Sequence, residues 1–184
     1  MKKRYWITAL CLMLTLVSKA QFEVVAKNST IQWTGYGAIG NYSLSGDLMI
    51  KSGAFETSEA GVLKQGSVVF DMKTISHDNK TLVKHLKSDD FFAVKQYPTA
   101  RFEIDSVNSQ NLIGRLTMRG ITKNIEVPYT LVGAGETLLL KGKVLVDRTG
   151  FGIRYNSSSF FKNLGSNAIK NDFEVIFELE LTAR

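Results

Sequence analysis

Residues 35–40, GYGAIG, have the glycine spacing of a dinucleotide-binding loop and are the first feature of this sequence that could support chemistry. Such a loop needs a strand before it and a helix opening at the third glycine, because the helix amino terminus holds the pyrophosphate. After Gly40, however, apolar and polar residues alternate from Leu44 to Lys51, which indicates a strand. We therefore interpret the glycines as a connection between two strands and expect no nucleotide cofactor.

Side chains that ligate metals or act in catalysis are few. His77 and His85 are the only histidines, so a metal site of the usual His/Cys type lacks ligands. Residues 89–90, two aspartates, could complete a mixed site, but such pairs more often cap a helix. Serines occur, at 157–159 among other places, without a nucleophile-elbow motif, and a triad would need a histidine within reach. The sequence therefore predicts no metal, no cofactor and no catalytic residue.

Residues 1–20 have the pattern of a secretory signal peptide. Basic residues at 2–4 precede an apolar run over 6–17, and small residues before Gln21 favour cleavage there. The run is shorter than the roughly 20 residues that a membrane span needs, so we expect no stable membrane insertion after cleavage. Cys11 lies inside the run, which leaves no cysteine for a disulfide. We expect a periplasmic or secreted protein.

The mature chain, residues 21–184, has little net charge. Four of the 23 basic residues lie within residues 1–20, which leaves 19 against 17 acidic residues. With no basic cluster interleaved with aromatics, a nucleic-acid partner has no support. The length suits one domain, and without disulfides its apolar core must hold the fold.

Apolar and polar residues alternate with period two along most of the chain, as in strands with one apolar and one polar face. Such strands must close around a shared interior, as an antiparallel barrel or a sandwich. The predicted strands, about eight in number, are centred on residues 29–34, 44–50, 68–73, 100–105, 115–119, 125–131, 138–147 and 173–181.

One segment, about residues 78–95, breaks this alternation. Leu82 and Leu86 have helical spacing behind a capping Asp or Asn, and a second short turn carries Phe91 and Phe92. Two short helices are expected here. The insertion could cover one mouth of a barrel, or it could cross over on the outside.

Three blocks of sequence resemble the YceI-like family of secreted polyisoprenoid-binding proteins, and they occur in the family's order. They are LKSDDFFAVKQYPTARFE at 86–103, GRLTMRGITKNIEVPYTL at 114–131 and DRTGFGI at 147–153. The resemblance implies an all-β fold, a single antiparallel eight-stranded lipocalin-like barrel whose apolar tunnel holds a polyisoprenoid or other long-chain amphipathic lipid. It implies no catalysis. Many relatives carry a histidine in the second strand block, whereas residues 41–46 here read NYSLSG.

Apolar residues at strand and insertion positions could line such a tunnel or fill an ordinary core, since both need the same surface. The expected lining residues are Trp33, Leu48, Ile50, Phe70, Met72, Leu82, Leu86, Phe91, Phe92, Phe102, Ile104, Leu116, Met118, Phe151 and Phe177.

Arg148, with His77 as a second candidate, is the group best suited to an anionic head group, because Arg binds phosphate with two parallel hydrogen bonds. A salt bridge from Arg148 to Asp147 or to an aspartate of the insertion is the alternative. Residues 154–171 form a long polar loop that could act as a second flap.

The leading function is an exported carrier that sequesters a polyisoprenoid or similar lipid. A hydrolase or isomerase acting on a lipid-like substrate and a ligand-free envelope-stress scaffold are the alternatives, and a homodimer stays open.

Overall fold

The structure is a computed structural model that describes residues 20–58 and 61–184. The predicted signal peptide, apart from Ala20, lies outside the described residues. The described part contains ten strands, one α-helix and four short 3₁₀ helices. In chain order they are β1 (Ala20–Val24), η1 (Ala26–Asn28), β2 (Thr30–Gly37), β3 (Ser43–Asp47), β4 (Met49–Thr57), β5 (Leu63–Asp71), η2 (Met72–Thr74), α1 (Lys80–Leu86), β6 (Thr99–Val107), β7 (Asn111–Met118), β8 (Ile121–Ala134), β9 (Thr137–Asp147), η3 (Arg148–Phe151), η4 (Gly165–Asn167) and β10 (Ile169–Ala183).

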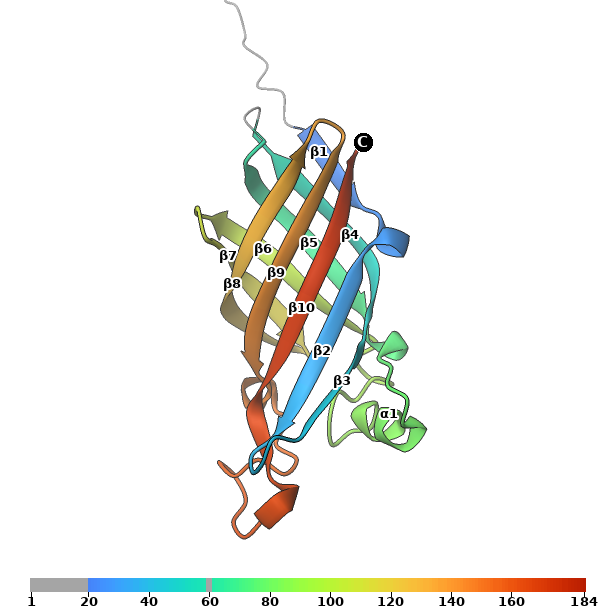
Figure 1. Ribbon diagram of the computed structural model, residues 1–184, viewed down its shortest axis with the longest axis vertical. Helices are drawn as coiled ribbons and strands as arrows, with labels where there is room; N and C mark the ends of the chain where they lie inside the picture. Colours follow the sequence, from blue (N-terminus) through green and yellow to red (C-terminus); the bar gives the residue numbers. More distant parts are fainter. Residues whose placement is uncertain (1–19, 59–60) are drawn as a thin grey trace, which may run out of the picture.

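The strands form one antiparallel sheet that closes on itself as an elongated barrel (Figure 1). From β4 to β10 each strand pairs with the next along the chain, and closure comes from β10, which pairs with β1. Every strand can therefore present one face to the interior and one to solvent, as the period-two alternation predicted.

The ten strands make an eight-stranded barrel because two positions in the barrel are each occupied by two consecutive strands, β1 with β2 and β3 with β4. The carboxyl-terminal end of β10 pairs with β1 and the rest of it pairs with β2, so β1 and β2 follow one another along the same neighbour. In the same way β4 pairs with β1, and β3 pairs with β2. The break between β1 and β2 is held by Ser29, whose hydroxyl donates to the Val25 carbonyl and accepts from the Glu180 N–H. The predicted eight-stranded antiparallel barrel is confirmed.

The hairpin between β7 and β8 shows how local sequence fixes the connections. Arg119 and Gly120 both have positive φ, 52° and 73°, as a two-residue turn of the mirror-image type requires. The Arg119 guanidinium then donates to the Phe91 carbonyl at 2.5 Å. The turn therefore also ties the helical insertion to the barrel.

The insertion lies beside one end of the barrel and contains one α-helix rather than two (Figure 1). Asn79 caps α1 by accepting hydrogen bonds from the N–H groups of Thr81 and Leu82. The prediction of a second helix around Phe91 and Phe92 is wrong, because those residues lie in hydrogen-bonded turns. Ala93 there has φ of 46°, a left-handed conformation that an α-helix cannot continue through.

A glycine lets the chain enter the insertion close to the sheet. A Cβ on Gly46 of β3 would lie 1.8 Å from the Ser76 carbonyl oxygen, so no other residue fits there without moving the backbone. The Ser76 N–H in turn donates to the Asp47 carbonyl. Among the described residues, no helix has the length and apolar character needed to cross a membrane.

Candidate ligand-binding site

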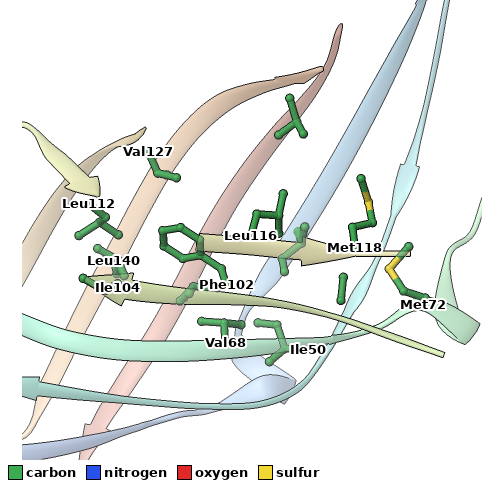
Figure 2. Close-up of a cluster of buried hydrophobic side chains, with 14 of the residues drawn as sticks. Ile50, Val68, Met72, Phe102, Ile104, Leu112, Leu116, Met118, Val127 and Leu140 are labelled. Atoms are coloured by element: carbon green, nitrogen blue, oxygen red, sulfur yellow. The ribbon is translucent and has the colours of Figure 1, made fainter. Parts of the chain in front are cut away.

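A slender apolar cavity of about 170 Å³ runs along the interior of the barrel. Its walls come from the inward faces of β2, β5 to β7, β9 and β10, among others, and from the insertion. Figure 2 shows part of the apolar interior, where Val68, Phe102 and Leu116 come from neighbouring strands. The strand alternation of apolar residues thus produces a continuous apolar surface along the barrel axis.

The cavity ends at Phe55, before the barrel end at which the chain terminates. That end is filled by large apolar side chains from β1, β4, β5, β9 and β10, all at most 5% exposed. Register places them at one level: Phe22 pairs with Phe55, and Leu138 with Leu181. The residues of this closed end are Phe22, Phe55, Leu63, Leu138 and Leu181.

The cavity approaches solvent at the opposite end, beside the insertion. There its lining includes the exposed residues Lys170 and Asp172 at the start of β10. Phe92 and Phe173 are half-buried lining residues whose rings meet edge to face, with centroids 6.4 Å apart. One aromatic comes from the insertion and the other from the barrel, so this contact helps to define the open end.

Arg148, which directly follows β9, is a buried cation in this apolar lining and is only 4% exposed. Its guanidinium donates to the carbonyl oxygens of Ile153 at 3.0 Å, Lys170 at 3.1 Å and Ile169 at 3.2 Å. It also lies 5.9 Å from the centroid of the Phe91 ring. Burial lowers the pKa of Arg148, and the nearby Asp147 carboxylate partly opposes that effect. The expected alternative, a salt bridge, is not what the structure shows, since main-chain carbonyls hold the guanidinium.

Trp33 on β2 supplies an unpaired polar group in the lining. Its indole Nε1 is buried and has no hydrogen-bond partner among the described residues. The indole N–H is a donor only, so an acceptor on a ligand is the partner it lacks. His77 lies nearby, its ring centroid 6.3 Å from that of Trp33, but its Nδ1 accepts from the Asn79 N–H and the residue is outside the lining.

Most of the residues expected to line a tunnel come together around this cavity. Ile50, Leu82, Ile104 and Phe151 do not border it, although all four are buried or half-buried in the surrounding core. The expected residues that do border it are Trp33, Leu48, Phe70, Met72, Leu86, Phe91, Phe92, Phe102, Leu116, Met118 and Phe177.

Several lining residues were not among those expected, although they occupy the apolar phase of the same alternating strands. Extending each apolar phase along the whole strand would have found them. They include Ile31, Val68, Ala100, Leu112, Ile125, Val127, Leu140, Val144, Val146, Phe173, Val175 and Leu179.

Two polar side chains that were considered as catalytic candidates, His85 and Ser157, are packed against aromatic rings or hydrogen-bonded to a neighbouring side chain. His85 lies between aromatic rings, 4.5 Å from Tyr155 and 5.1 Å from Phe91 by centroid, and its Nε2 has no partner in the described structure. Ser157 is fully buried and donates to the Asn171 side chain at 2.7 Å. Within residues 20–58 and 61–184, no three His, Cys, Asp or Glu side chains gather as a metal site would require.

Residues 22–181 match the YceI-like domain. The chain belongs to the YceI-like family. A curated relative from Pseudomonas aeruginosa strain LESB58, called a UPF0312 protein, is 34% identical over 89 residues. That match covers 39% of this chain and 47% of the relative, so the chain spans about half the length of such relatives.

Solved structures share the fold at low sequence identity. BcnA from Burkholderia cenocepacia superposes with a TM-score of 0.70 at 18% identity, covering 85% of this chain and 98% of that one. A polyisoprenoid binding domain from Saccharophagus degradans gives 0.67 at 12% identity, with 89% and 98% covered. Both structures support the barrel fold of this chain.

Proposed function

We propose that this protein is a non-catalytic carrier that holds the tail of a polyisoprenoid or similar long-chain lipid inside the barrel. The observation that carries the proposal is an apolar cavity that is closed at one barrel end and approaches solvent at the other. Burial of each chain methylene would contribute about 0.8 kcal/mol. A polyisoprenoid binding domain among the proteins of similar fold supports the same ligand class.

The size of the cavity bears on chain length. At about 15 Å³ for each water-sized group, about 170 Å³ accommodates roughly eleven of them, which corresponds to about two five-carbon isoprene units. A longer chain would need the lining to widen. Met72 and Met118 are suited to this, because unbranched thioether side chains change rotamer readily.

For the head group we propose an oxygen acceptor near the open end. Three main-chain carbonyls use three of the five N–H donors of Arg148, so donors remain for a ligand oxygen. The unpaired Trp33 N–H is the second donor in the lining. His77 stays a weaker proposal, because its Nδ1 is already engaged by the main chain.

We also propose that the protein is exported after cleavage before Gln21. The support is the basic and apolar pattern of residues 1–20. Amino-terminal sequencing of protein released by osmotic shock checks this. An intact Met1 on a membrane-bound form would contradict it.

Mass spectrometry of organic extracts from the purified protein tests the carrier function. A stoichiometric long-chain lipid supports it. Conversion of added lipid to a product would instead favour a hydrolase or isomerase. Failure to find a lipid and to bind added prenols of two to eleven isoprene units would favour a ligand-free scaffold.

The head-group proposal is tested by comparing a prenol with the prenyl phosphate of equal length. Arg148→Lys should weaken binding of the phosphate more than that of the alcohol, because lysine cannot present two parallel donors. Equal weakening of both ligands would assign Arg148 a purely structural role.

A further inference from the structure

Large apolar side chains are exposed together at the open end of the barrel. Ile39 and Tyr42 lie on the connection between β2 and β3, and they are 62% and 60% exposed. Tyr155, Phe160 and Phe161 lie on the loop before η4 and are 37% to 50% exposed. Four of these five residues are aromatic, and we call the whole set, Ile39 included, the aromatic rim. A group of exposed apolar side chains on one surface marks an interaction site more often than single exposed residues do.

A main-chain hydrogen bond and the pairing of Gly37 with Ile169 join the two segments that carry the aromatic rim. The Ala38 N–H donates to the Ala168 carbonyl at 2.8 Å, which connects the β2–β3 turn to the segment before β10. Within the other loop, the N–H groups of Phe160 and Phe161 both donate to the carbonyl of buried Ser157. Figure 1 shows both loops at the same end of the barrel. Main-chain hydrogen bonds therefore hold in place the loops that carry these side chains.

The two loops that carry the aromatic rim have a net positive charge, and the exposed Asp172 follows them at the start of β10. Residues 37–43 and 154–171 contain three basic residues, Arg154, Lys162 and Lys170, and no Asp or Glu. The Arg154 guanidinium lies 4.7 Å from the centroid of the Phe160 ring, and the Lys170 ammonium lies 5.5 Å from that of Tyr36. Aromatic side chains beside cations are typical of surfaces that rest at the boundary of an anionic bilayer.

The rim is continuous with the cavity. Ile169 and Lys170 follow the rim loop directly and line the open end. We propose that the aromatic rim docks on the surface of an anionic lipid bilayer, with the open end of the cavity toward the lipid. This inference rests on the proposed carrier function, because it gives an apolar chain a route from bilayer to barrel that avoids water.

Sedimentation with lipid vesicles tests the docking, using phosphatidylglycerol mixed with phosphatidylcholine and phosphatidylcholine alone. We expect the protein to bind the anionic vesicles more strongly, and added salt to weaken binding. Phe160→Ser/Phe161→Ser should reduce binding at least tenfold, and Lys162→Gln about fivefold, as expected for one cation near an anionic surface. Lys162→Gln removes no apolar packing and so stays informative if the double variant folds poorly.

Matched variants away from the rim serve as controls. Val132→Ser/Leu145→Ser removes two exposed apolar side chains from outer faces of β8 and β9, and Lys64→Gln removes a cation from β5 near the closed end. Neither should change vesicle binding. Equal losses in the rim and control variants, or no vesicle binding by the wild-type protein, would overturn the docking.

Two further measurements keep this inference separate from the carrier function. Binding of a prenol supplied in dispersed form should be the same for Phe160→Ser/Phe161→Ser and the wild type, since the rim lies outside the lining. A protein that binds the prenol without recognising vesicles would retain the carrier function and lose the docking. Light scattering after gel filtration tests whether the rim instead binds a second copy of this chain. A dimer that the rim variants dissociate would show that it does, and would contradict the proposal.

Discussion

The two ends of this barrel share the same alternation of side chains along their strands, yet they differ in packing. At the closed end, Phe55, Leu63 and Leu181 are at most 2% exposed, and of these three only Phe55 borders the cavity. At the open end, the half-buried Phe92 and Phe173 border the cavity beside exposed Lys170. The same alternation of apolar residues therefore gives a tightly packed core at one level of the barrel and a cavity at another. Variants at each end should separate the contribution to stability from the proposed binding.

The largest effect on stability should come from the closed end. Leu181→Ala removes a fully buried side chain and should lower the free energy of unfolding by about 2 to 5 kcal/mol, because the surroundings cannot fill the space. Urea unfolding measures this change. Leu145→Ala, at a 60% exposed position, is the control and should change stability little. A small loss for Leu181→Ala would mean that the closed end is not tightly packed.

Arg148 should give the next largest effect, at the open end. Arg148→Lys keeps the charge but cannot reach all three carbonyls, so we expect a loss of about 1.5 to 3 kcal/mol in unfolding free energy. Arg154→Lys, at an exposed position, is the matched control and should stay within about 0.5 kcal/mol. Unchanged stability in Arg148→Lys would show that these carbonyl contacts contribute nothing net.

A substitution between the two ends tests whether the interior is open to a ligand. Phe102→Trp should shorten the longest prenol that binds, because the larger ring occupies space along the cavity. In a filled core the same change would instead overpack by about 1 to 3 kcal/mol. Chain-length preference and melting temperature distinguish these results. Glu103 lies on the outer face of β6, where its carboxylate forms an ion pair with Arg101. Glu103→Gln should therefore leave prenol binding unchanged.

The smallest effect is expected for the unpaired donor in the lining. Trp33→Phe removes the indole N–H, which has no partner in the described structure. Affinity for a prenol should fall about fivefold, corresponding to one hydrogen bond of about 1 kcal/mol. Displacement of a bound fluorescent lipid probe by the alcohol and by the matching hydrocarbon checks the cause. An equal loss for the hydrocarbon would attribute the effect to ring size rather than to the N–H.

The sequence by itself was sufficient for the all-β class, the barrel and the family. Period-two alternation requires strands with one buried face. The three ordered sequence blocks identify the family more specifically than the glycine spacing of residues 35–40 identifies a nucleotide site. Those glycines do lead into a strand, β3, as predicted. The insertion was located correctly as well, and its first helix follows from Leu82 and Leu86 behind the Asn79 cap.

Tertiary structure alone decided which apolar residues border a cavity and which fill the core. Phe102 and Ile104 occupy the same phase of β6, yet only Phe102 lies in the lining. Local alternation fixes the face of a side chain, whereas its level along the barrel depends on strand register and on the side chains opposite it. Two partners of Arg148 were hidden for the same reason: the Ile169 and Lys170 carbonyls lie 21 and 22 residues away and meet the guanidinium only after β10 pairs with β9.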